Sequence, residues 1–309
     1  MASECIKQNF YFVPNNIIPS QDTPTLLNIK DKECCFELKV FGNTLTSDFL
    51  QNDKNGFLFW FKKDLISTID LSLEKLVNDN WLTVTGLSNN SYGTFYPWLF
   101  FVNDSDEGFI GYQIEWRNVL INFDEGAYRV KCSVTTVLGS SFSTTSLEYC
   151  LEKYSAFRAE GTVRIEYNIS GVSGDKNNDK IKKDFGNLFW YNSIRLKGYF
   201  GFPEDTYEQD YVLYNNGQRA YVTDEQEPEF ILHLKHMPAY VHDIMSVDVL
   251  RADQILISDY NARNAQRWVQ KAVQKPNEYK PVWKHMKNKQ APVTIRLRQE
   301  YNNLKKTRQ

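Results

Sequence analysis

The sequence lacks a long apolar run. Its longest uninterrupted apolar or aromatic stretch, Phe95 to Val102, has eight residues and includes Pro97, whereas a helix that crosses a bilayer needs about 20. The basic start and apolar run of a signal peptide are also missing. We therefore expect a protein that is synthesised in the cytoplasm, with no membrane insertion by this chain.

Recognisable catalytic motifs are missing as well. The sequence contains no Gly-x-Ser-x-Gly, the motif that positions a hydrolase serine, and no Gly-x-x-x-x-Gly-Lys, the motif of a phosphate-binding loop. The acidic groups Glu204-Asp205 and Asp224-Glu225-Gln226-Glu227 lie beside turn residues, where charge keeps loops soluble. A glycosidase would instead need two carboxylates that face each other across a cleft. We predict no catalytic residues and no cofactor.

A metal site is not predicted either. His233, His236 and His242 lie close together. In a strand over residues 230–235, however, a spacing of three puts the first two rings on opposite faces, and no cysteine or clustered acid completes a ligand set. The histidines are predicted to be structural or to lie on the surface.

Cysteine is scarce and shows no pairing pattern. Its five positions are Cys5, Cys34, Cys35, Cys132 and Cys150. The number is odd and no Cys-x-x-Cys spacing occurs, so we expect reduced and mostly buried thiols.

The composition is that of a globular protein. Of 309 residues, 42% are hydrophobic, 24% are charged and 15% are aromatic, which excludes disordered, collagenous and coiled-coil classes. The length suits two domains. The heavy aromatic content is typical of proteins with extensive protein interfaces, and favours an assembly subunit over a freely soluble enzyme.

Charge is distributed unevenly along the chain. Residues 1–155 carry 12 Lys/Arg against 19 Asp/Glu, and residues 156–309 carry 24 against 19, which gives net charges of −7 and +5. The segment from Arg263 to the end holds 13 basic residues and two acids, a net charge of +11. This polarity suits head-to-tail packing of copies, or contact with an acidic partner or nucleic acid.

Residues 1–30 are predicted to form an extended N-terminal arm, because prolines at 14, 19 and 24 interrupt any continuous element. The adjacent Phe10, Tyr11 and Phe12 are candidate contacts of this arm with its own body or with a neighbouring copy. The alternative is a frayed terminus.

Residues 31–158 are predicted to form a β-sandwich domain with one helix. Short runs rich in β-branched and aromatic residues, separated by turn signals, predict strands over 35–41, 81–86, 94–102, 110–116 and 128–138. Leu65, Ile69, Leu73 and Leu76 have helical spacing and predict an amphipathic helix over 64–76. A single helical turn is expected at 116–120.

Residues 159–309 are predicted to form a second β-rich domain with a basic C-terminal helix and tail. Strands are expected at 162–169, from Ile194, at 230–235, at 254–258 and at 293–297, with a short helix over 238–245 that is opened by proline. Asn216-Gly217 predicts a hairpin over 211–222 with a type I′ turn. The fold class is therefore mainly β: two β-sandwich-like domains with a few short inserted helices and an extended N-terminal arm.

Two basic features follow the predicted strand at 254–258. A helix over 261–274 would align Arg263, Arg267, Lys271 and Lys275 at four-residue spacing as one basic stripe. A mixed surface follows, with candidate residues Tyr279, Lys280, Trp283 and Lys284. Both features could be solvated surfaces, could dock on an acidic protein, or could contact phosphates non-specifically, with the aromatic rings available for stacking.

Several phrases of the sequence resemble virion structural proteins of crAss-like tailed bacteriophages of gut Bacteroides hosts. They are Gly111 to Leu120 (GYQIEWRNVL), Asp124 to Val130, Trp190 to Phe202 and Ala252 to Asn261, within a similarity over about residues 110 to 300. The resemblance implies a non-enzymatic ring protein of the tail or neck, located in the virion between portal and tail tip around the genome-ejection channel. It carries over no site residue.

We therefore expect a cyclic homo-oligomer, six- or twelve-fold, that contacts other tail or portal proteins and touches double-stranded DNA at most non-specifically. A head-to-tail interface closes into a ring when its rotation permits. The alternative is a carbohydrate- or receptor-binding module, which a groove of exposed Trp and Tyr would reveal. An enzyme such as a glycosidase is the third possibility.

Overall fold

The computed structural model describes residues 38–62, 66–101, 104–170, 189–201, 204–261, 269–283, 290–298 and 305–307. The fold is mainly β, with several sheets and few short helices, as predicted. The predicted division into domains 31–158 and 159–309 stays a prediction, but sheet membership does change between the strand that ends at Lys153 and the strand that begins at Thr162.

In the described residues, the first half of the chain forms two sheets. The six-stranded sheet has the order β1 (Leu38–Gly42), β9 (Tyr149–Lys153), β7 (Gly126–Thr136), β3 (Ile66–Val77) and β4 (Asn80–Gly86), with β8 (Ser141–Thr145) also paired to β7. The three-stranded sheet has the order β2 (Lys54–Lys62), β6 (Asp104–Glu115) and β5 (Gly93–Phe101). Helix α1 (Trp116–Phe123) follows β6 and includes the helical turn predicted at 116–120.

The predicted helix over 64–76 is wrong, because residues 66–77 form strand β3. Ile69, Leu71 and Leu73 are buried at alternate positions and pair in register with Val134, Cys132 and Val130 of β7. The helical stripe left out Leu71, whose burial depends on a period of two. Packing against β7 therefore outweighs the local helical spacing.

The second half of the chain forms one curled sheet in the described residues. Its order is β12 (Glu204–Leu213), β13 (Arg219–Pro238), β11 (Phe189–Phe200), β10 (Thr162–Ser170), β14 (Gln254–Asp259) and β15 (Lys271–Val273), and both β16 (Gln290–Arg298) and β17 (Lys305–Thr307) pair with β13. Its helical segments are α2 (Ala156–Ala159), α3 (Ala239–Ile244) and the π-helix η3 (Met245–Val249). Helix α3 confirms the prediction over 238–245, with Pro238 as its N-cap.

The predicted helix over 261–274 is wrong in its described part. Residues 262–268 lie outside the described residues, and Lys271–Val273 is strand β15, paired antiparallel with β14 through Ile255↔Val273 and Ile257↔Lys271. The four-residue spacing of basic side chains indicated a helix, but β14 offered an edge with which residues 271–273 could form backbone hydrogen bonds. This pairing excludes a helical stripe that continues through Lys271.

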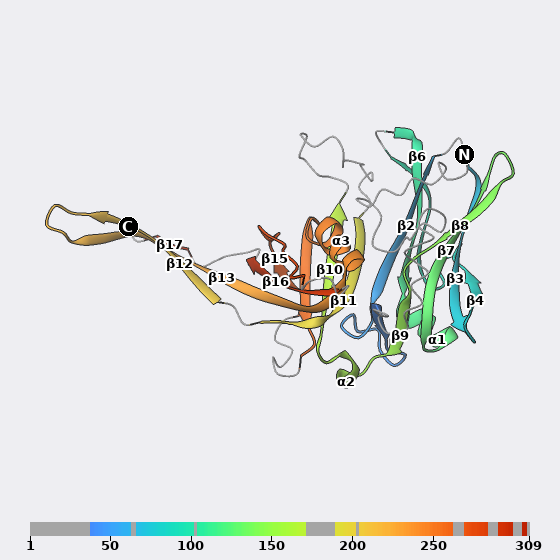
Figure 1. Cartoon of the computed structure of the whole chain (residues 1–309), viewed down its shortest axis with the longest axis horizontal. Helices are drawn as coiled ribbons and strands as arrows, with labels where there is room; N and C mark the ends of the chain where they lie inside the picture. Colours follow the sequence, from blue (N-terminus) through green and yellow to red (C-terminus); the bar gives the residue numbers. More distant parts are fainter. Residues whose placement is uncertain are drawn as a thin grey trace.

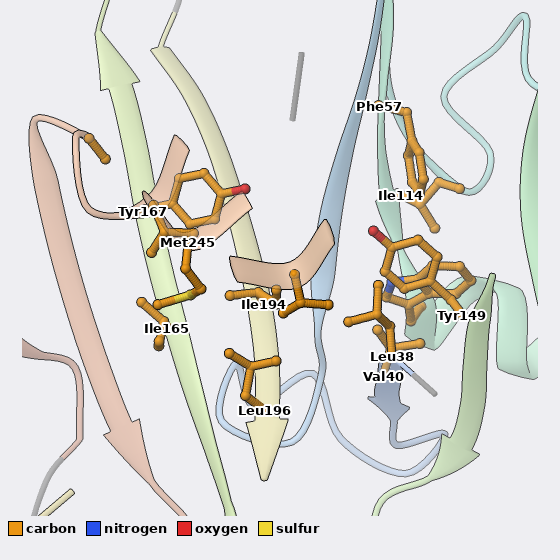
Figure 2. Packing of buried hydrophobic residues seen from close by; sticks show 14 of the residues in the cluster. Leu38, Val40, Phe57, Ile114, Tyr149, Ile165, Tyr167, Ile194, Leu196 and Met245 are labelled. Atoms are coloured by element: carbon orange, nitrogen blue, oxygen red, sulfur yellow. The ribbon is translucent and has the colours of Figure 1, made fainter. Parts of the chain in front are cut away.

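One hydrophobic cluster runs through both halves of the molecule. Figure 2 shows Leu38, Phe57 and Tyr149 from the first half on one side, and Ile165 of β10 and Ile194 of β11 from the second half on the other. The Phe57 and Tyr149 rings meet edge to face at 5.7 Å. Full burial of each such side chain contributes about 1.5–3 kcal/mol, so the continuous core fixes the two halves against each other.

A buried polar cluster joins the same two halves. Asp53, just before β2, accepts hydrogen bonds from Arg195 of β11, from Arg164 of β10 and from the backbone N–H of Phe41. The hydroxyl of Tyr260 donates to the Leu50 carbonyl at 2.7 Å. The segment that connects β1 to β2 is therefore held from the first half by backbone pairing and from the second half by arginine and tyrosine side chains.

Candidate assembly interface

A long β-hairpin projects from the body of the protein (Figure 1). It consists of β12 and the outer part of β13, residues 204–229, which we call the hairpin arm. Its register runs from Glu204↔Glu229 at the root to Leu213↔Arg219 near the tip. Because a strand rises about 3.3 Å per residue, the 10 residues of β12 reach roughly 33 Å beyond the root.

The predicted hairpin at Asn216-Gly217 is confirmed, although its turn differs from the predicted type I′. Tyr214 N–H donates to the Gln218 carbonyl at 2.8 Å, and Gly217 N–H donates to the Tyr214 carbonyl at 2.9 Å. Within the turn only Gly217 has a positive φ, +80°, and Asn216 Oδ1 accepts a hydrogen bond from Gln218 N–H. This is the pattern of a three-residue loop closed by a bulged glycine.

The hairpin arm continues into the core sheet. The inner part of β13 buries Phe230, Leu232 and Leu234 and pairs with β11 and β16. At this root Gly198 of β11 lies so close to β13 that an added Cβ would sit 2.3 Å from the His233 carbonyl oxygen. Only glycine permits this approach. The direction of the arm is therefore set by packed core residues.

The hairpin arm is strongly acidic. Residues 204–229 hold eight acids, Glu204, Asp205, Glu208, Asp210, Asp224, Glu225, Glu227 and Glu229, and one base, Arg219, for a net charge of −7. The acids at 204–205 and 224–227 were expected beside turns, but they lie along the two strands. The register sets Glu204 opposite Glu229 and Glu208 opposite Glu225. Like charges directly opposite one another destabilise a strand pair, so the arm needs positive charge nearby.

Two arginines of β16 supply that charge at the root. Arg296 Nη1 lies 3.2 Å from Glu229 Oε2 and 3.6 Å from Glu204 Oε2. Arg298 Nε lies 3.6 Å from Glu229 Oε1. A single guanidinium thus bridges the acidic pair at the root, where the arm leaves the body.

Farther out, the basic C-terminal tail pairs with the arm. Strand β17 is antiparallel to β13, with Lys305↔Glu225, Lys306↔Asp224 and Thr307↔Thr223 as backbone partners. Cross-strand neighbours of opposite charge stabilise a sheet. In the described residues β12 pairs with β13 alone, so its outer edge is open along its length. Such an edge offers backbone donors and acceptors to another chain.

The predicted basic stripe is only partly described. Arg263 and Arg267 lie outside the described residues. Lys271 lies in β15 with its Nζ 5.1 Å from the centre of the Phe230 ring, and partial burial lowers the pKa of this lysine. Lys275 is exposed in the loop that follows. Lys271 is therefore packed at the core, and Lys275 is available to a partner.

The predicted basic-aromatic surface is brought together around a buried histidine. His242 Nδ1 lies 2.6 Å from the Tyr279 hydroxyl, His242 Nε2 lies 3.0 Å from the Ala291 carbonyl, and the Trp283 ring centre is 5.2 Å from the imidazole. Burial lowers the pKa of His242, despite opposing hydrogen bonds to backbone carbonyls. We call residues 275–283 the docking loop. Lys284 lies outside the described residues.

The docking loop presents both charge and apolar surface. Lys280 is exposed and pairs with Glu278, and Val282 and Trp283 are 57% and 48% exposed. The backbone holds the loop to the body, because Val282 N–H donates to the Pro292 carbonyl at 3.0 Å. The loop is thus an anchored surface of the second half.

The structure describes the remaining predicted residues only in part. Phe10, Tyr11 and Phe12 lie outside the described residues. In the described part of the chain no three His, Cys, Asp or Glu residues gather as metal ligands, and His233 stacks on Tyr199 at 4.4 Å. Cys132 is a buried thiol, and burial raises its pKa.

None of the helices in the described ranges has the length and hydrophobicity needed to span a membrane. Compared with known proteins, the chain matches no family model, no curated sequence and no solved structure.

Proposed function

We propose that the protein is a non-enzymatic structural subunit of a bacteriophage virion, a ring-forming tail or neck protein that surrounds the genome-ejection channel between portal and tail tip. The observation that supports this most is the hairpin arm, which leaves the body as a ribbon and continues the core strand β13. Because it projects from the body, the arm is suited to contact with a neighbour.

The attachment of the arm also supports an assembly role. Phe230, Leu232 and Leu234 anchor its root in the core, and Gly198 fixes the approach of β11. Copies joined head to tail form a closed ring only if each contact repeats the same rotation. An arm with a fixed direction meets that requirement better than a flexible tail would.

The charge pattern is compatible with the same arrangement. The arm carries a net charge of −7, whereas the segment from Arg263 to the end carries +11. A six- or twelve-fold ring would bring opposite charges of neighbouring copies together, and basic residues left facing the channel would contact double-stranded DNA only through its backbone. Other tail or portal proteins would cover the ends of such a ring.

A carbohydrate- or receptor-binding module would need a groove of exposed aromatic rings. Of Trp81, Trp116 and Trp283, the tryptophans whose burial the structure describes, only Trp283 is largely exposed. Its ring packs against His242. The described tryptophans therefore provide no row of exposed rings, and the projecting hairpin arm favours the assembly role.

The proposed function is tested by native mass spectrometry and negative-stain images of the purified protein at low and moderate salt. Closed rings of defined copy number are the expected result. Monomers at every concentration and salt would contradict a self-assembling ring, and a screen on glycan arrays would then examine the alternative.

A further inference from the structure

We infer that the hairpin arm of one copy docks on the docking loop, residues 275–283, of a second copy of the same chain. This inference rests on the proposed function, since it names the contact that would close the ring. The two surfaces lie on one chain, but the arm points away from the body that carries the loop (Figure 1). Contact between them therefore joins different copies.

The arm keeps an excess of negative charge after its own basic neighbours are counted. Its net charge is −7, and Arg296, Arg298, Lys305 and Lys306 offset four of these charges, which leaves −3. All four belong to β16 and β17, which pair with β13 on the side away from β12, although the Arg296 side chain reaches Glu204 of β12. The acids of β12, Glu208 and Asp210 among them, belong to the strand at the open edge of the sheet. A basic partner surface fits this edge.

Two exposed apolar or aromatic side chains lie beside the polar turn at the tip of the arm. Leu213 is 61% exposed and Tyr214 is 56% exposed. From tip to root the arm therefore offers this pair of side chains and then an acidic strand. Interfaces of this composition combine an apolar anchor with charged surroundings that set the orientation.

The docking loop has the complementary arrangement. Val282 and Trp283 supply apolar surface, and the exposed Lys275 and Lys280 supply positive charge, one of which Glu278 balances. Tyr279 and His242 hold this surface on the body. The loop belongs to the segment from Arg263 onward, which keeps a net charge of +7 once Arg296, Arg298, Lys305 and Lys306 are counted with the arm. Leu213 and Tyr214 would contact Trp283, and the acidic edge would lie along the lysines.

Charge reversal on the arm gives a clean test because it removes a repulsive pair of like charges from the hairpin and therefore does not destabilise the hairpin itself. Glu208→Lys converts the Glu208↔Glu225 pair into an attractive one, so the variant E208K/D210K keeps its hairpin while losing complementarity to the loop. The matching loop variant is K275E/K280E. Controls with the same change in charge at exposed positions are E148K/E160K and K153E/K197E.

Sedimentation velocity is measured for all variants at low salt. Each double variant is expected to weaken self-association by at least roughly tenfold, while both controls assemble as the wild type does. The chain that carries all four substitutions regains assembly, and a mixture of the arm variant with the loop variant forms alternating complexes.

A photo-crosslinking experiment locates the contact. Tyr214 is replaced by the photoreactive benzoyl-phenylalanine in the full chain, and isotopically labelled and unlabelled copies are mixed. Crosslinks from position 214 of one copy to residues 275–283 of another support the inference. Crosslinks confined to other segments overturn it.

The outcomes separate the two proposals. Wild-type rings that persist in E208K/D210K overturn the arm contact and leave the ring function standing. If assembly depends on the arm but yields only dimers or open filaments, the proposed arm contact is supported and the proposed ring function is contradicted. A wild type that stays monomeric at every concentration overturns both.

Discussion

Arg195 holds Asp53 by both carboxylate oxygens across 142 residues of sequence. Arg195 Nε lies 3.0 Å from Oδ2 and Nη2 lies 2.8 Å from Oδ1, while the guanidinium is 4.2 Å from the centre of the Tyr260 ring. Arg164 adds a third hydrogen bond at 3.2 Å. Because all three charged groups are buried, this two-arginine clamp is a charged connection between the sheets of the first half and the curled sheet that carries the hairpin arm.

Asp53→Asn should therefore destabilise the whole chain. The amide keeps the shape of the carboxylate but leaves the buried Arg195 without a carboxylate partner and Arg164 with Glu166 alone. Breaking a buried ion pair in this way costs about 3–5 kcal/mol. The free energy of unfolding in urea measures this effect. Asp70→Asn, at an exposed position of β3, is the control and should change stability by less than about 0.5 kcal/mol. Equal effects of the two substitutions would show that the clamp contributes nothing.

The same clamp predicts a loss of stability in acid. Burial alone would raise the pKa of Asp53, but Arg195 and Arg164 outweigh burial and hold the pKa below its ordinary value. Stability from this group is therefore complete above the unfolded pKa of about 4 and is lost as pH falls through the lower folded pKa. Urea unfolding over a pH series should show a smaller loss below about pH 4 in Asp53→Asn than in the wild type. Parallel curves would contradict the assignment.

His242 predicts a second pH effect, at higher pH and confined to the docking loop. Burial holds its pKa below the ordinary value, so the folded state favours the neutral ring. The contribution of this group to stability is present above about pH 6.5 and is lost as pH falls toward the folded pKa. Hydrogen exchange of peptides over 274–283, corrected for intrinsic rates, should rise in this range in the wild type.

A substitution distinguishes this histidine from other titrating groups. His242→Ala removes the partner of the Tyr279 hydroxyl and should cost about 1–3 kcal/mol, with fast exchange of the docking loop at every pH. His236→Ala, at an exposed position, is the matched control. If His242→Ala keeps the wild-type pH dependence of loop exchange, another group is responsible.

Local patterns predicted most of the regular elements. The helical turn at 116–120, the proline-opened helix before Met245 and the hairpin at Gly217 are present, because each depends on residues that are neighbours in sequence. The two wrong helices, over 64–76 and 261–274, failed because β7 and β14 offered strand pairing to those segments. Spacing within a segment carries no information about such a partner.

The candidate interface was predictable only in part. Lys275, Lys280 and Trp283 were selected from their composition and are exposed, whereas Lys271 packs on Phe230. The hairpin over 211–222 was predicted, but its extension over residues 204–229 was missed, because the acids at 204–205 and 224–227 were interpreted as solvated turn residues. The sequence also does not indicate that this hairpin projects from the body. The acids on both sides of Gly217 could have indicated a hairpin that needs a basic partner, because two acidic strands repel one another when they pair.

The basic tail should steady the hairpin arm, and this role is separable from assembly. Strand β17 sets Lys305 and Lys306 opposite Glu225 and Asp224, and each such cross-strand pair contributes about 0.2–1 kcal/mol. K305E/K306E places like charges opposite one another, so hydrogen exchange of peptides over 219–229 should become several-fold faster, while peptides from β7 and β10 keep their protection.

K305R/K306R preserves the charges and should leave exchange of the arm as in the wild type. High salt should narrow the difference between the two variants, because it screens exposed charges. Arm exchange that is the same in both variants would mean that the backbone pairing of β17, rather than its lysines, holds the tail on β13.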